Sequence, residues 1–99
     1  MHCIKIHRSY RSIVAVCDSN LLGKKFEEDI RQLDIRENFY NGKNIEKEEL
    51  IRTIIKELKE DATFNIVGKD SVNAALEAGV IDKSCIAEIH GIPFALKLL

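Results

Sequence analysis

Residues 61–82, DATFNIVGKDSVNAALEAGVID, decide the fold that we expect for this chain. They predict a strand or turn, then a glycine, then a helix. Asp70 or Ser71 can cap this helix by accepting a hydrogen bond from a first-turn N–H, and apolar residues recur on one helical face: Val72, Ala75 and Leu76. Gly79 is predicted to end the helix, because glycine adopts the left-handed conformation without strain.

A second helix is predicted just before this stretch, over residues 45–59. Asn44 can cap it, and glutamates in its first turn and lysines in its last turn complement the helix dipole. Its apolar positions share one face: Leu50, Ile51, Ile54, Ile55 and Leu58.

The N-terminal part predicts two strands. Residues 3–7 alternate, with Ile4 and Ile6 on one side, which is the period of a half-buried strand. Residues 12–17, SIVAVC, are apolar on both faces, so we expect the innermost strand of the sheet here. Asp18 is expected to cap the turn that follows.

The remaining segments predict shorter strands. Residues 24–38 have an apolar residue every two to four positions, which favours one or two amphipathic strands. Asn41 and Gly42 predict a turn, since both tolerate positive φ. Residues 85–89 and 94–98 form either a closing hairpin or two strands paired elsewhere. These elements predict an α+β fold, with a small mixed or antiparallel sheet packed against two main helices.

Four motifs together resemble one protein family: AVCDSNLLGKKF (15–26), FYNG (39–42), ATFNIVGKDSVNAALEAGVID (62–82) and HGIPFA (90–95). Over nearly the whole chain they resemble the archaeal family known as domain of unknown function 424. The resemblance implies an archaeal, cytoplasmic protein with a single compact domain, and it transfers no activity. Phe94 stands where the family pattern has a histidine after Gly-x-Pro, so no role of that histidine transfers.

Length and composition limit the class of protein. Ninety-nine residues with 45% hydrophobic content suffice for one core, which predicts a single domain over residues 1–99. No apolar run approaches the roughly 20 residues that span a bilayer, and the N-terminus lacks the apolar region of a signal peptide. We therefore expect a soluble protein without a membrane partner.

The cysteines indicate a reducing compartment. Cys3, Cys17 and Cys85 are odd in number and contain no CxxC pair, which argues against a disulfide framework and agrees with the cytoplasmic setting that the resemblance implies. His2, Cys3 and His7 are candidate zinc ligands, but on a strand His2 faces away from the other two. We expect no metal and no cofactor.

The net charge of −1 conceals an uneven distribution. Residues 1–26 carry five Lys or Arg against one acid, and residues 27–61 carry seven against eleven. A basic rim that contains an aromatic residue can hold phosphates and stack a base. The leading hypothesis is a non-catalytic binding module for RNA or a ribonucleoprotein partner, with these contacts: Lys5, Arg8, Tyr10, Arg11, Lys24 and Lys25. The alternative role of this rim is a solvated edge that prevents aggregation.

A small enzyme is the competing hypothesis. Four residues of the motifs can converge as a polar site, with His90 as a further candidate: Asp18, Lys24, Asn65 and Lys69. Turn hydrogen bonding and solvation explain the same residues. Gly68 and Lys69 resemble the end of a phosphate-binding loop, although Thr63 and Asp70 break that motif.

Two further interpretations remain open. Cys17 ends the central strand, where sites open in sheet proteins, although a buried structural thiol fits the apolar run better. A protein-interaction module can use the acidic middle third or an exposed sheet edge to pair with a partner or a second copy, so a homo-oligomer stays open as well.

Overall fold

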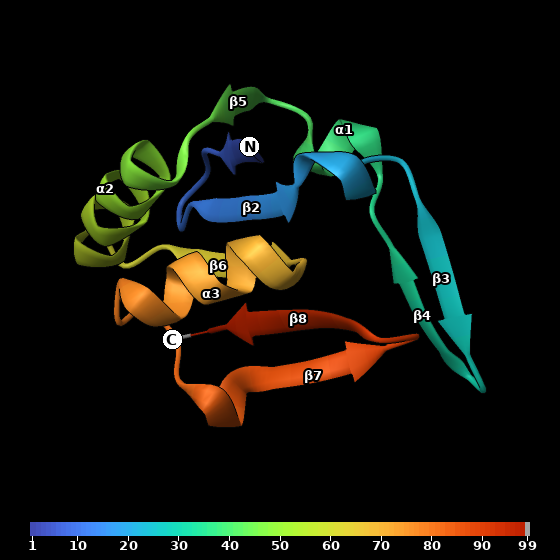
Figure 1. The fold of residues 1–99 in the computed structure, drawn as a ribbon. Helices are drawn as coiled ribbons and strands as arrows, with labels where there is room; N and C mark the ends of the chain where they lie inside the picture. The colour runs from blue at the N-terminus through green and yellow to red at the C-terminus, as the bar shows by residue number, and fades with distance from the viewer. Residues whose placement is uncertain (99) are drawn as a thin grey trace.

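The computed structural model describes residues 1–98 of the chain, and Figure 1 shows its fold. Its strands are β1 (His2–His7), β2 (Ile13–Asp18), β3 (Lys25–Glu28), β4 (Arg31–Asp34), β5 (Lys43–Ile45), β6 (Thr63–Val67), β7 (Ile86–Ile89) and β8 (Ile92–Lys97). Its helices are α1 (Glu37–Tyr40), α2 (Lys47–Lys59) and α3 (Lys69–Glu77), with 3₁₀ turns at Ser19–Leu21 and Lys83–Cys85.

A six-stranded sheet in the order β5-β1-β2-β6-β8-β7 forms the centre of the fold. The middle pair, β2 and β6, is parallel, and every other pair of neighbours is antiparallel. The predicted α+β fold with a mixed sheet is therefore confirmed. The strand predicted as innermost lies in the middle pair, and the last two strands form the closing hairpin.

The helices α2 and α3 pack against one face of the sheet and enclose the main core. Phe64, Leu50 and Ile54 are buried there, as are Val14 and Val16 of the central strand. Burying each large aliphatic or aromatic side chain contributes about 1.5–3 kcal/mol. This helical layer covers one face of the sheet.

The opposite face of the sheet is only partly covered. A second apolar cluster forms where α1, the first 3₁₀ turn and the β3–β4 hairpin lie over the sheet: Cys3, Ala15, Cys17, Leu21, Leu33, Ile35, Tyr40, Val67 and Ile89. The hairpin is a separate two-stranded unit that extends beyond the main sheet (Figure 1). Arg31 ties it to β7 by donating to the Glu88 carbonyl at 3.0 Å. Beyond this cover Leu96 remains 51% exposed.

The predicted caps of α3 are wrong. The helix begins at Lys69, after Gly68 with a φ of +106°, so Asp70 and Ser71 lie inside its first turn. Their backbone N–H groups donate to the two carboxylate oxygens of Asp18, at 3.1 and 2.7 Å. Asp18 therefore caps α3 and makes no side-chain cap for the turn after β2, because the parallel pairing of β2 and β6 brings both strand ends together. The predicted stop at Gly79, whose φ is +75°, is confirmed.

The start of α2 also differs from the prediction. Asn44 does not cap the helix, because it belongs to β5, where it pairs with Cys3 and accepts a hydrogen bond from Ser19 Oγ at 2.9 Å. Asn41 has a φ of −85° and Gly42 is not in the positive-φ region, so the chain bends at the predicted turn without the positive φ that both residues tolerate. A glycine is required at position 42 because a Cβ there would lie 2.4 Å from the Ile4 carbonyl oxygen.

Candidate nucleic-acid interface

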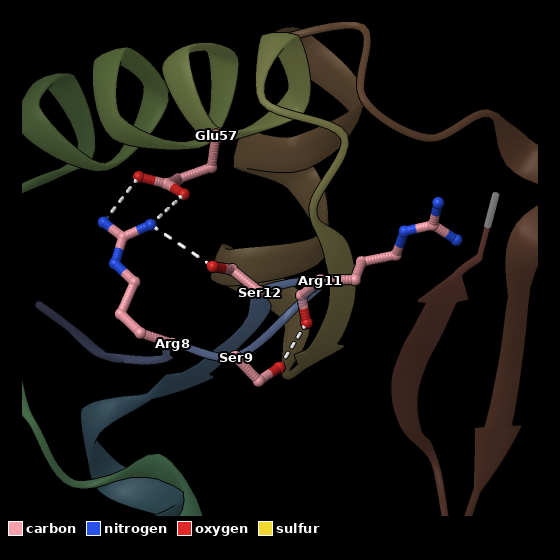
Figure 2. Close-up of polar contacts among 5 residues, drawn as sticks. All are labelled: Arg8, Ser9, Arg11, Ser12 and Glu57. Carbon is pink, nitrogen blue, oxygen red and sulfur yellow. Dashed lines mark hydrogen bonds and ion pairs between the residues drawn. The ribbon is translucent and has the colours of Figure 1, made fainter.

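A bidentate salt bridge joins the loop between β1 and β2, residues 8–12, to α2 (Figure 2). Arg8 Nη1 and Nη2 donate to Glu57 Oε1 and Oε2 at 2.9 and 3.0 Å. The Glu57 side chain is 3% exposed and the Arg8 side chain 63% exposed. These hydrogen bonds, and then the attraction of the carboxylate, raise the pKa of Arg8. The pair satisfies a carboxylate that would otherwise be buried alone, and it fixes one side of the loop.

Tyr10 and Arg11 form the free side of this loop. Ser9 Oγ donates to the Arg11 carbonyl at 2.7 Å, which orders the backbone between them. The Arg11 side chain extends away from Arg8 and Glu57 (Figure 2), and it has no ion-pair partner within residues 1–98. The exposed fraction of Tyr10 is 104%, so its ring lies entirely in solvent. An ordered loop thus presents an aromatic face and a guanidinium.

The structure divides the six basic-rim residues into two places. Arg8, Tyr10 and Arg11 share the loop, and Lys5 lies on the adjoining strand, where its Nζ donates to the Asn38 carbonyl at 2.8 Å. Lys24 and Lys25 follow the other end of β2. The two groups are separated by the length of a six-residue strand, roughly 17–20 Å. A ligand shorter than this distance therefore meets only one of the two groups.

The four residues of the alternative polar site do not converge. Asp18 and Lys69 line one cavity of about 380 Å³, but both carboxylate oxygens of Asp18 already accept hydrogen bonds from α3. Lys24 is exposed and lies outside the lining of that cavity. Asn65 lines a different cavity, over β6 and β8. In the former cavity, capping of α3 occupies the Asp18 carboxylate, and the second carboxylate of the lining, Asp70, is exposed on the first turn of α3.

Asp18, His2 and Ser71 have the residue types of a hydrolytic triad, but not its geometry. His2 Nδ1 lies 2.8 Å from Ser71 Oγ, whereas Asp18 contacts the backbone of Ser71 rather than the imidazole. Ser71 is 1% exposed, so a substrate cannot reach its hydroxyl. Burial, and then the N-terminal amino group, lower the pKa of His2. The cluster is a buried hydrogen-bond network that fastens β1 and β2 to α3.

The thiols do not form a nucleophilic or metal site among the described residues. Cys17 is fully buried, and burial, and then the neighbouring Cys3, raise its pKa to about 12. A thiol with that pKa is protonated at neutral pH and is a poor nucleophile. Within residues 1–98 no three histidine, cysteine or acidic side chains gather as metal ligands. His7 instead stacks on Phe39, with ring centroids 4.6 Å apart.

Sequence reasoning missed two residues that shape these sites, Glu57 and Tyr40. The position of Glu57 in the sequence indicates its role. It lies three residues after Ile54 on the buried face of α2, where a carboxylate requires a partner. Tyr40 is the last residue of α1 and is 7% exposed. Its role depends on the packing of α1 over the sheet, and no local pattern indicates it.

Comparison with known proteins agrees with the resemblance drawn from the four motifs. Residues 7–98 match the model of the family described as "Protein of unknown function (DUF424)". The solved structure titled "Crystal structure of an uncharacterized conserved protein from Methanopyrus kandleri" superposes with a TM-score of 0.86 at 27% sequence identity. The match covers 96% of this chain and 88% of that chain. No curated protein matches the sequence.

None of the helices in residues 1–98 combines the length and the apolar content needed to cross a membrane.

Proposed function

We propose that this chain, which belongs to the DUF424 family of proteins of unknown function, is a non-catalytic module that binds single-stranded RNA, free or within a ribonucleoprotein, through the β1–β2 loop. The observation that carries the proposal is Tyr10, an entirely exposed ring between two arginines on an ordered loop. Its ring is free to stack on an unpaired base. Because the backbone is already ordered, binding costs little loop entropy.

The arginines have different roles in this proposal. Arg11 is free of an ion pair in the described chain and is the main phosphate contact. Arg8 is largely neutralised by Glu57, and it positions the loop more than it attracts RNA. The acidic side chains beside Arg8 also weaken the local positive potential, so stacking on Tyr10 supplies more affinity than charge does. Lys24 and Lys25 are a second contact for an RNA long enough to cross the sheet.

Affinity measured against salt concentration tests this function. Fluorescence anisotropy with a mixed-sequence single-stranded RNA should give a log–log slope near −0.7 per phosphate neutralised. Arg11→Ala should make the slope shallower by about 0.7, and Arg8→Ala by less. Tyr10→Ala should weaken binding by about 1–3 kcal/mol at an unchanged slope, because stacking releases no counterions.

Lys83→Ala and Lys97→Ala are the control variants, since both lysines lie outside the loop. They should bind RNA as the wild type does. If they weaken binding as much as Arg11→Ala, the attraction is diffuse and the loop is not the site. No measurable binding at low salt refutes the function.

A protein-interaction module is a second candidate, favoured by the edge of β1. The strand β5 pairs only with residues 2–4 of β1, so residues 5–7 have no strand partner on that side in the described chain. A cavity of about 310 Å³ beside this edge is lined by Ile6, Ile45 and Thr53, among others. An extended peptide of a second copy can add to such an edge and insert an apolar side chain. Light scattering that detects a dimer lost in Ile6→Lys supports this candidate, and a monomer at every concentration excludes it.

The cytoplasmic location is part of the proposal. Cys3, Cys17 and Cys85 are all free thiols, which suits a reducing compartment.

A further inference from the structure

The uncovered half of the sheet contains a small pocket over β6 and β8. Its volume is about 210 Å³. Apolar side chains form most of its surface, and two polar side chains complete it: Leu33, Val67, Phe94 and Leu96, with Tyr40 and Asn65. Sites for drug-sized ligands usually measure roughly 300–1,000 Å³. This pocket therefore suits a single planar ring system rather than a larger ligand.

The hydroxyl of Tyr40 is the first polar group that this pocket offers. The side chain is 93% buried, yet its hydroxyl has no hydrogen-bond partner in the described chain. No side-chain oxygen or nitrogen in residues 1–98 is both closed to solvent and unpaired, so this hydroxyl keeps some contact with solvent, and Tyr40 is one of the residues that line the pocket. Burial, and then the Cys17 thiol, raise the pKa of Tyr40 to about 12. The hydroxyl therefore stays protonated and can donate a hydrogen bond.

The amide of Asn65 is the second polar group. It lies on the face of β6 opposite the helices, between Ala15 of β2 and Leu96 of β8. Asn65 is half-buried, and its amide makes no hydrogen bond to another residue of the described chain. An amide supplies two donors and an acceptor on one planar group. By contrast, the buried His2 ring is paired with the Ser71 hydroxyl, and the buried Asp18 carboxylate accepts hydrogen bonds from backbone N–H groups of α3.

We infer that this pocket binds an unpaired nucleobase, and adenine in particular. An asparagine amide matches the adjacent donor and acceptor of the adenine N6 and N7 edge, and the apolar walls match the faces of the ring. A duplex cannot present a base in a pocket of this size, so the base comes from a single strand or a free nucleotide.

The pocket adjoins the proposed RNA-binding loop, and its use by RNA rests on the proposed function. The N–H of Thr63 donates to the Ser12 carbonyl at 3.0 Å, and Ser12 follows Arg11. Asn65 is two residues farther along β6, which is roughly 7 Å. An RNA strand stacked on Tyr10 can therefore continue along the sheet and place a base farther along the strand at Asn65.

Titration of the wild-type protein with AMP, GMP, CMP and UMP, followed by NMR, tests the pocket by itself. AMP should shift the Asn65 side-chain amide signals more than the other nucleotides do. Asn65→Ala and Tyr40→Phe should each weaken AMP binding about tenfold, since each removes one hydrogen-bonding group. Asn73→Ala is the matched control, because Asn73 is an exposed asparagine on α3, and its affinity should equal that of the wild type.

The same titration separates the pocket from the proposed function. Tyr10→Ala should weaken RNA binding, while AMP should still shift the Asn65 side-chain amide signals in this variant. If no nucleotide perturbs Asn65 at millimolar concentration, or if Asn65→Ala binds AMP as well as Asn73→Ala does, the inference about the pocket is overturned, whatever the RNA measurement gives. If AMP binds and RNA does not, the inference about the pocket is supported and the proposed RNA function is refuted.

Discussion

The polar side chains at the two ends of strand β2 differ in whether they already have hydrogen-bond partners. At the carboxyl end, Asp18 is buried and both of its oxygens accept hydrogen bonds from α3. At the amino end, Tyr10 is entirely exposed, and Arg11 is an exposed residue whose side chain extends away from Arg8 and Glu57. Polar groups whose hydrogen bonds are already made stabilise the fold, whereas ordered groups left without partners are available for a ligand. This difference, rather than residue type, separates the structural end from the candidate binding end.

Gly68→Ala should give the largest loss of stability, because it disrupts the buried end of β2. Gly68 has φ +106° and ψ 150°, a region that only glycine adopts readily, and a Cβ would lie 2.4 Å from Asp18 Cγ. Backbone strain and the displaced cap together should cost roughly 3–5 kcal/mol in the free energy of unfolding by urea.

Gly79→Ala is the matched control for this substitution. Gly79 also has positive φ, +75°, but nothing lies within 4 Å of an added Cβ. Its loss should be about 1–2 kcal/mol, from the left-handed backbone alone. Equal losses in the two variants would show that contact with Asp18 contributes nothing.

Asp18→Ala should have the next largest effect. It leaves the N–H groups of Asp70 and Ser71 without their acceptor, which should cost roughly 1–3 kcal/mol. Asp18→Asn keeps one acceptor oxygen and should lose less. Urea denaturation measures both variants, and a loss in Asp18→Ala below about 0.5 kcal/mol would contradict the capping role.

The pH dependence of stability should report on His2 in the same buried network. Burial lowers the pKa of His2 below its ordinary value of 6.5, so the unfolded chain binds a proton at a higher pH than the folded chain does. The contribution of neutral His2 to the free energy of unfolding is therefore complete above pH 6.5, and it is lost as the pH falls below 6.5 toward the lowered pKa. His2→Gln should flatten the stability profile in that window. An unchanged pH profile in His2→Gln would contradict this role of His2.

Tyr10→Ala and Arg11→Ala should have the smallest effects on stability. Both side chains are exposed and make no side-chain contact that holds the fold, so each variant should unfold within about 0.5 kcal/mol of the wild type. Thermal denaturation checks this expectation. A larger loss in either variant would mean that the loop is part of the folded core, and it would weaken the contrast between the two ends of β2.

Local patterns predicted most of the fold. The alternation in β1, the apolar run of β2 and the apolar face of α2 identified the elements, because each depends on periodicity within one segment. The stop of α3 at Gly79 was also local. These features need no knowledge of distant residues.

Contacts between distant segments could not be predicted. Asp18 caps α3 across 52 and 53 positions of sequence, and Arg8 reaches Glu57 across 49. Parallel pairing of β2 and β6 creates the first contact, and the packing of α2 over the sheet creates the second. For the same reason the sequence grouped Lys24 and Lys25 with the Arg8–Arg11 loop, although β2 holds them apart, and it grouped Asn65 with Asp18, although they line different cavities.

Mapping an RNA onto the protein by NMR tests the central claim most directly. Backbone amide shifts are followed while a short single-stranded RNA is added to the wild-type chain at low salt. The proposed function predicts that the largest changes fall on residues 8–13 and on the neighbouring Thr63 and Asn65, and that Tyr10→Ala removes most of them. Changes centred on α2, α3 or the Asp18 end of β2, or no changes at all, would contradict it.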